Sequence, residues 1–271
     1  MKVIGKTIVV TGGGSGIGRE ITLLLLKRGA RVAAIDINET TLNETATLAG
    51  DHQDRLSLHV VNITDKAAVE AFADEIVKHY GAVDGIINNA GIIQKFVKIN
   101  DLDYGNIEKV MNVNFWGTVF CTREAIPYLL KSKGSVVGVS SIAGFQGLPA
   151  RTGYSSSKFA MHGFLNTLRV ETLNQGLHVM IACPGFTESN IRNTALTADG
   201  SPQGSTPLDE KHLMSAEDVS DRILRGIEKR KRTLVMTTQG KLVVLLGKFF
   251  PKWVDKMTYK TMKKEKNSPL K

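Results

Sequence analysis

The 271-residue sequence has only two cysteines, Cys121 and Cys183, which lie far apart and form no CxxC pair. Disulfide frameworks and cysteine-based zinc sites need closely spaced or paired cysteines, so the sequence argues against both. The six histidines show no ligand spacing either, and no metal is expected. So few cysteines are typical of a protein in a reducing compartment, and a cytoplasmic location is expected.

Long apolar runs are also missing from the chain. No window reaches the roughly 18 uninterrupted apolar residues that a membrane-spanning helix requires. The first residues, Met1-Lys2-Val3-Ile4-Gly5-Lys6, lack the apolar stretch of a signal peptide. What remains is a composition of 42% hydrophobic and 23% charged residues, which is typical of a soluble enzyme with a full core.

Charge is spread unevenly. Residues 222–271 hold 15 Lys and Arg against 3 Asp and Glu, whereas residues 1–221 hold 20 against 23. Such an asymmetry bears on binding partners rather than on the fold. Because the body is slightly acidic and no known nucleic-acid-binding motif accompanies the basic end, nucleic acid is not expected as a partner.

Short Val- and Ile-rich runs alternate with amphipathic stretches along the chain. They predict strands at 6–11, 31–36, 56–61, 83–88, 135–140, 177–183 and 232–237. Helices are predicted between them, at 17–28, 39–48, 66–79, 104–132, 153–174 and 215–230, with Pro127 expected to tilt or interrupt its helix. Repeated βαβ units predict an α/β fold: a single doubly wound parallel-sheet domain of the Rossmann type over 1–238, followed by a C-terminal amphipathic helical extension over 239–271.

The extension is both basic and amphipathic. Its apolar residues at helical spacing are Leu242, Leu245, Leu246 and Phe249, then Trp253, Val254 and Met257 after Pro251. A basic amphipathic helix with Trp and Phe can lie on an anionic membrane surface. The same helices could instead cover a substrate pocket or dock on a sister subunit, and the sequence leaves these alternatives open.

The most informative residues are Tyr154 and Lys158. Four residues apart, they share one face of the helix predicted over 153–174. Tyrosine is a weak acid with a reference pKa of about 10, and a lysine charge held close favours the phenolate and brings that pKa towards the working range. Ser141 lies thirteen residues before Tyr154, near the end of a predicted strand. Taken alone, such a pair is more often an ordinary surface Tyr and Lys.

A glycine-rich turn follows the first predicted strand. The segment 11–18, TGGGSGIG, has the spacing GxxxGxG, and glycines there let the backbone approach a pyrophosphate at a helix N-terminus. Asp36 ends the second predicted strand, where a carboxylate can accept hydrogen bonds from ribose hydroxyls and would repel a 2′-phosphate. NAD is therefore favoured over NADP, although Arg19 could still reach that region, and Asp36 could instead be a turn or helix cap.

Five features occur in one order: the glycine pattern, the NNAG segment at 88–91, Asn114, Ser141 and the Tyr154-x-x-x-Lys158 pair. In this order and spacing the chain resembles the short-chain dehydrogenase/reductase family over about residues 5–237. The resemblance implies that Tyr154 is the general acid or base and that Ser141 donates a hydrogen bond to the same substrate oxygen. It also implies that Lys158 holds the nicotinamide ribose and that Asn114 helps hold a water linking Lys158 to solvent.

The resemblance assigns binding positions as well. Those for the cofactor are Gly12, Ser15, Gly16, Ile17, Gly18, Asp36, Asn62, Ile63, Asn88, Ala90, Gly91, Tyr154, Lys158, Pro184, Gly185, Thr187 and Ser189. Asn62 stands where the family commonly has Asp, and Ser189 where it often has Thr. Those for the substrate are Ile93, Gln94, Phe96, Phe145, Leu148 and Phe186. Most of the latter are apolar, which indicates a lipophilic substrate such as a steroid, a retinoid, or an acyl or prenyl compound.

The expected function is therefore NAD(H)-dependent interconversion of a lipophilic secondary alcohol and its ketone. By resemblance, the helices at 104–132 and 153–174 are expected to build a homodimer or homotetramer. The expected location is cytoplasmic, with peripheral contact to membranes if the extension binds lipid. Two alternatives stay open: an NADP-dependent carbonyl reductase, and a non-catalytic, membrane-associated dinucleotide-binding sensor. The complete set of four catalytic groups argues against the sensor, which need not retain them.

Overall fold

The structure is a computed structural model that describes residues 1–94, 96–185, 214–265 and 268–271. Its centre is a seven-stranded sheet in the order β3-β2-β1-β4-β5-β6-β7, with every described pairing parallel. The strands are β1 Thr7–Thr11, β2 Arg31–Asp36, β3 Leu56–Val60, β4 Gly85–Asn88, β5 Ser135–Val139, β6 His178–Cys183 and β7 Thr233–Val235.

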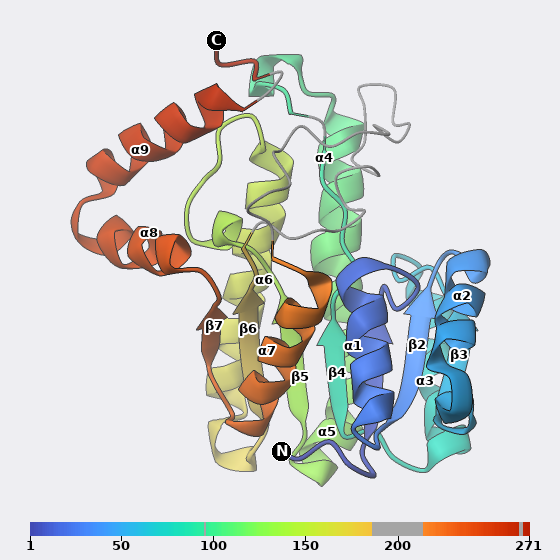
Figure 1. Ribbon diagram of the computed structural model, residues 1–271. Coiled ribbons are helices and arrows are strands. Elements are labelled where there is room, and N and C mark those ends of the chain that lie inside the picture. Colours follow the sequence, from blue (N-terminus) through green and yellow to red (C-terminus); the bar gives the residue numbers. More distant parts are fainter. Residues whose placement is uncertain (95, 186–213, 266–267) are drawn as a thin grey trace.

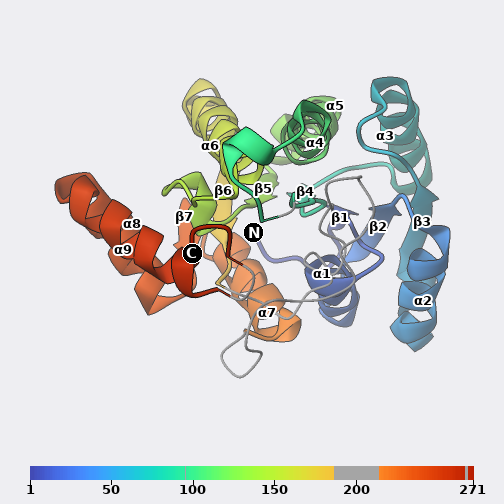
Figure 2. The same ribbon diagram turned by 90° about the horizontal axis from the view of Figure 1, so that it is seen from above.

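Helices cover both faces of the sheet (Figure 1 and Figure 2). One face carries α3 Lys66–Tyr80, α4 Tyr104–Met111, α5 Gly117–Ser132 and α6 Thr152–Glu171; the other carries α1 Gly16–Lys27, α2 Glu39–Ala49 and α7 Ala216–Glu228. Side chains alternate between the two cores, so Val9 packs towards α3, α5 and α6 while Ile8 and Val10 pack towards α1 and α7. Burial on both faces explains the continuous apolar runs in the sequence, and the predicted doubly wound α/β fold is confirmed.

The long predicted helix at 104–132 is divided in a different place from the one expected. A π-helical turn at Asn112–Trp116 separates α4 from α5, whereas Pro127 lies inside α5 without ending it. A proline removes one helical hydrogen bond, to the carbonyl four residues earlier. That residue, Arg123, is exposed, so water can satisfy its carbonyl. The irregularity instead falls at Asn114, one of the predicted catalytic residues.

The C-terminal extension forms a hairpin of α8 Thr238–Phe249 and α9 Pro251–Lys264. Its inner side packs on the body, where Met262 and Leu270 form a small apolar cluster with Phe96 and Ala150. Gln146 also donates a hydrogen bond to Asp255 of α9 at 2.9 Å. None of the helices in the described ranges is long and apolar enough to cross a bilayer.

Candidate active site

The predicted site residues gather at the edge of the sheet where the parallel strands end. The glycine turn follows β1, the segment 88–91 closes β4, Ser141 follows β5, and Pro184 follows β6. This edge is at the top of the sheet in Figure 1. The strand order reverses between β1 and β4, and ligands of open α/β sheets bind at such a switch point.

The glycine turn has a backbone that side chains would disrupt. Gly12 and Gly16 have φ angles of +69° and +51°, in the left-handed region. A Cβ on Gly18 would overlap the carbonyl oxygen of Gly12, so the start of α1 packs directly on the turn. Ser15 is the N-cap of α1, and Ile17 lies in its first turn. The turn therefore presents backbone and a helix N-terminus, which suit a pyrophosphate.

Asn89 and Thr11 fix this turn to the end of β4. The Asn89 side chain donates to the carbonyls of Thr11 and Gly12, at 3.1 and 3.3 Å. The Thr11 hydroxyl accepts the main-chain N–H groups of Asn89 and Ala90, both at 3.0 Å. The family resemblance covers Asn89 only as part of the 88–91 segment, and Asn89 is not among the predicted binding positions. An amide directly after a buried strand is the one local signal for it, and that signal does not reveal its partners on the glycine turn. Its neighbour Asn88 points into the core, where it donates to Thr122 at 2.9 Å.

Asp36 both caps a turn and faces the glycine segment. One carboxylate oxygen accepts the N–H of Gly14 at 3.1 Å and the other that of Asn38 at 3.1 Å. Arg19, the residue that could have served a 2′-phosphate, donates to the Gly14 carbonyl at 2.6 Å and to Glu44 at 2.5 Å. Its guanidinium is therefore held by a carbonyl and a carboxylate beside Asp36.

The remaining cofactor positions differ in what they offer. Asn62 is exposed, and its side chain accepts two hydrogen bonds from Thr64, at 3.0 and 2.9 Å. The Ile63 side chain is buried in the core, so only its main chain can face a ligand. Pro184 and Gly185 directly follow β6. Thr187, Ser189 and the substrate-side Phe186 lie outside the described residues.

Tyr154 and Lys158 lie together on α6, as their spacing predicts. The Lys158 Nζ is 5.7 Å from the centroid of the Tyr154 ring. Lys158 is only 3% exposed, donates to the carbonyl of Val139 at 3.0 Å, and has its pKa lowered by burial to about 8. A Cβ on Gly91 would stand 3.7 Å from this Nζ and 3.2 Å from the Asn114 Oδ1. The four residues thus adjoin one another beside the end of β4.

Asn114 is fully buried in the π-helical turn and clamps two segments together. Its side chain exchanges hydrogen bonds with the main chain of Ile92, at 2.8 and 2.9 Å, and donates to the Ser157 hydroxyl at 2.9 Å. Ser157 in turn donates to the carbonyl of Tyr154 at 2.8 Å. Both amide hydrogens of Asn114 are engaged, while its Oδ1 retains capacity for one further donor, such as water.

Ser141 is accessible, whereas Ser140 is not. Ser141 is half-buried, and its hydroxyl accepts the N–H of Ala143 at 3.2 Å, which leaves the hydroxyl hydrogen to donate elsewhere. The Ser140 hydroxyl is buried 2.7 Å from the Nε2 of His162. Of the two serines, Ser141 is therefore the more accessible, and its catalytic role stays a prediction.

His162 continues the Tyr154–Lys158 stripe by one more helical turn, a role the sequence analysis missed. Its ring packs directly against Gly144, where a Cβ would be 2.5 Å from two ring atoms. The Phe145 and His162 rings meet edge to face, with their centroids 4.5 Å apart. Burial, and then the Lys158 charge, lower the pKa of His162 to about 4, so the ring is neutral near pH 7. A neutral His162 ties α6 to the turn that carries Ser141. The same-face spacing 154, 158, 162 was the signal for it.

The residues expected on the substrate side lie in different surroundings. Gln94 is fully buried, accepts the N–H of Tyr154 at 2.8 Å, and so supports the start of α6. Phe96 lies 4.7 Å from the Arg151 guanidinium and packs against the extension. Ile93 and Phe145 are half-buried near the strand ends.

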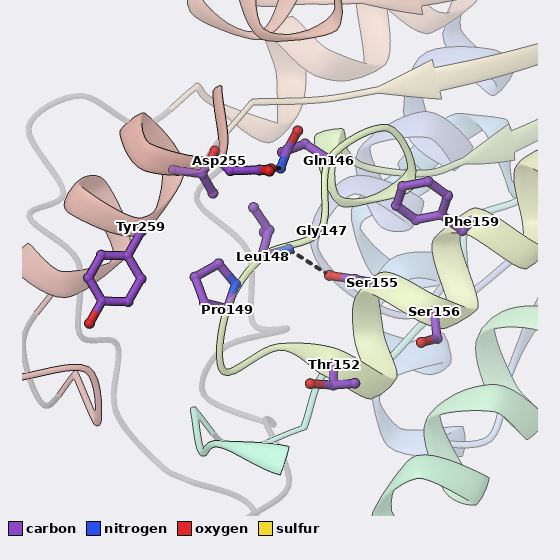
Figure 3. A pocket seen from close by; sticks show the side chains of 11 residues that line it. Gln146, Gly147, Leu148, Pro149, Thr152, Ser155, Ser156, Phe159, Asp255 and Tyr259 are labelled. Carbon is purple, nitrogen blue, oxygen red and sulfur yellow. Dashed lines mark hydrogen bonds between the residues drawn. The ribbon is translucent and has the colours of Figure 1, made fainter. Parts of the chain in front are cut away.

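Leu148 lines a different space, a groove of about 560 Å³ between α6 and α9 (Figure 3). The α6 residues that line the groove are Thr152, Ser155, Ser156 and Phe159. By helical spacing these lie on the face of α6 opposite Tyr154 and Lys158. The groove is therefore separate from the cluster around Tyr154.

Neutral, buried His162 makes stability sensitive to acid. Because its folded pKa of about 4 is below the reference 6.5, the unfolded chain binds more protons in that interval, and stability falls as pH drops through it and levels off below about 4. The loss is on the order of 3 kcal/mol at most. We expect His162→Gln, which cannot titrate but can still bond Ser140, to lose less stability between pH 7 and pH 4.5 in urea unfolding. Equal losses in both proteins would contradict this assignment.

Comparisons with known proteins agree with this geometry. The family model described as short chain dehydrogenase matches residues 6–199. The chain is 34% identical over 192 residues to 3-oxoacyl-[acyl-carrier-protein] reductase FabG of Thermotoga maritima, covering 70% of this chain and 77% of the relative. It is 31% identical over 260 residues to 11-beta-hydroxysteroid dehydrogenase-like 2 of Arabidopsis thaliana, covering 93% and 80%.

A solved structure of a short chain dehydrogenase/reductase from Burkholderia phymatum, in complex with NAD, has the same fold. It superposes with a TM-score of 0.83 at 22% identity and covers 93% of this chain and 96% of that one. The family model spans well over half of the sequence, and the relatives exceed 30% identity over most of it. The chain therefore belongs to the short-chain dehydrogenase/reductase family of oxidoreductases.

Proposed function

We propose that the protein interconverts a lipophilic secondary alcohol and its ketone with NAD(H), using Tyr154 as the general acid and base. The observation that carries this proposal is the buried Lys158 ammonium, 5.7 Å from the Tyr154 ring centroid and adjacent to Gly91. A phenol can move a proton at neutral pH only if its anion is stabilised, and a neighbouring cation does so. Bound NAD would accept the hydride when the alcohol is oxidised, and NADH would supply it when the ketone is reduced.

The other polar groups have roles that follow from their hydrogen bonds. Ser141, with one hydroxyl hydrogen to donate, would stabilise negative charge on the substrate oxygen while Tyr154 gives up its proton. Asn114 holds the segment at Ile92 against α6 and keeps one acceptor position for a water that resupplies protons. Gln94 and His162 act through Tyr154 and Ser141, since each fixes the backbone next to one of them.

The residues around the glycine turn fit a dinucleotide, and they favour NAD over NADP. The left-handed glycines and the start of α1 would hold the pyrophosphate, with Asp36 on the adenosine ribose. A 2′-phosphate would meet the Asp36 carboxylate, while Arg19 is already bound to Glu44 and the Gly14 carbonyl. The solved NAD complex of similar fold supports the same choice.

A lipophilic substrate is supported by two lines. The described residues near the strand ends include the half-buried Ile93 and Phe145. The names of the relatives refer to 3-oxoacyl groups on an acyl carrier protein and to 11-beta-hydroxysteroids. Both kinds of compound carry an oxygen function on an apolar skeleton. An acyl, steroid or retinoid-type ketone or alcohol would suit such a site.

We also propose an oligomeric state and a cellular location for the protein. Exposed aromatic residues on the helices expected to build a homodimer or homotetramer are Tyr104, Trp116 and Phe159. Such side chains on a helical face favour a subunit interface. The two buried, unpaired thiols fit a cytoplasmic protein, and the basic extension fits peripheral contact with anionic membranes.

Replacing Tyr154 with Phe tests the proposed acid and base directly. The variant should lose at least about a thousandfold in kcat, because the phenol hydroxyl carries the proton, while NADH binding measured by fluorescence stays within a factor of a few. Tyr259→Phe, on an exposed side chain of α9, is the matched control and should keep full activity. Substantial turnover by Tyr154→Phe on a panel of apolar ketones and alcohols would contradict the mechanism.

Replacing Asp36 with Asn tests the cofactor preference. Asparagine keeps an acceptor for the Gly14 N–H but removes the charge that repels a 2′-phosphate. The ratio of kcat/KM with NAD to that with NADP should fall about tenfold or more. An unchanged ratio, or a wild-type preference for NADP, would contradict the proposal that Asp36 selects NAD.

A further inference from the structure

The outer edge of the C-terminal hairpin is a row of exposed large apolar side chains. We call this row the apolar edge; it consists of Leu242, Leu245, Phe249, Phe250 and Trp253, which are 47–68% exposed. The first three share one stripe of α8 by helical spacing, and the last two continue it across the turn into α9. Five such residues in one short hairpin form a patch rather than scattered surface apolar groups.

The apolar edge is distinct from the side of the hairpin that packs on the body. The buried residues of the hairpin are Gly240, Val243, Val254, Thr258 and Met262. Both views place the hairpin beyond β7, with the α8–α9 turn projecting from the rest of the molecule (Figure 1 and Figure 2). The hairpin therefore packs on the body through its inner side alone, and the apolar edge remains exposed on its outer side.

Positive charge flanks the apolar edge. Lys241, Lys248, Lys252 and Lys256 are exposed along the same hairpin. The only acidic residue in 238–264 is Asp255, which accepts a hydrogen bond from Gln146. Apolar and aromatic side chains bordered by lysines match the interface of an anionic bilayer, where rings sit at headgroup level and ammonium groups meet phosphates.

We infer that the apolar edge inserts into the headgroup region of an anionic lipid bilayer, with these lysines on the lipid phosphates. The inference rests on the peripheral membrane contact proposed above and not on the proposed reaction. It assigns that contact to one surface of the molecule. The residues that enter the bilayer are not part of the site at the strand ends. A second copy of the chain covering the edge is the competing occupant that the experiment must exclude.

Vesicle sedimentation tests the inference on the full chain. The wild type should bind vesicles of phosphatidylglycerol and phosphatidylcholine at least tenfold more tightly than pure phosphatidylcholine, and less tightly as salt rises. The variant Phe249→Ser/Phe250→Ser/Trp253→Ser should lose at least tenfold in affinity for the mixed vesicles. A matched control, Leu48→Ser/Ile99→Ser/Leu173→Ser, removes three exposed apolar side chains elsewhere and should bind as the wild type does.

Tryptophan emission gives an independent readout of depth. The chain has two tryptophans, so Trp116→Phe leaves Trp253 as the sole reporter. Its emission should shift to the blue on adding the mixed vesicles and be quenched by lipids brominated near the headgroup. An unshifted emission from a protein that sediments with vesicles would place the contact elsewhere and overturn the inference.

The outcomes separate the two proposals. If the wild type binds neither vesicle, peripheral contact and the apolar edge both fail. If the wild type binds but the serine variant binds equally well, peripheral contact stands and the apolar edge is overturned. If the serine variant changes the oligomeric state in light scattering while vesicle binding is unaltered, the edge is a subunit interface and the inference is likewise overturned.

Discussion

The buried ammonium of Lys158 is the feature on which the site depends. A charge this deep is unfavourable unless polar groups meet it. Here burial lowers the pKa of Lys158 to about 8, and the Val139 carbonyl accepts a hydrogen bond from its ammonium group. That contact joins α6 to the end of β5. Near pH 7 the group remains largely charged and lies beside Tyr154. The proposed stabilisation of the Tyr154 phenolate gives this buried charge a function.

Two hydrogen-bonded ties hold this arrangement from either side. Asn114 connects the π-helical turn to Ile92 and Ser157, and His162 connects α6 to the turn that follows Ser141. Each tie uses a side chain on one element and a partner distant in sequence. The proposed catalytic groups are thereby fixed by rigid elements, as alignment of reacting atoms requires.

The sequence could predict the sheet, the glycine turn and the Tyr154–Lys158 face because these depend on local period and backbone freedom. It could not reveal that Gln94 supports α6 or that Asn89 anchors the glycine turn, since both depend on contacts across the fold. The sequence also predicted that Pro127 would tilt or interrupt the 104–132 helix, whereas the irregularity lies at Asn112–Trp116. Water can satisfy the exposed Arg123 carbonyl that the proline leaves without a helical donor. The extension was left ambiguous because an apolar helix face can meet lipid, a substrate pocket or a sister subunit alike. Only the fold separates the buried Val243 and Val254 from the exposed Leu242 and Trp253.

The most direct test of the central claim is the pH dependence of alcohol oxidation in the wild type and in Lys158→Met. Methionine keeps an apolar stem of similar length but removes the charge. If the ammonium promotes ionisation at the active site, the apparent pKa of the rising limb of kcat/KM moves up by more than one unit in the variant. A limb at the same pH, with only the maximal rate reduced, would contradict the claim and leave Lys158 a purely structural or cofactor-holding role.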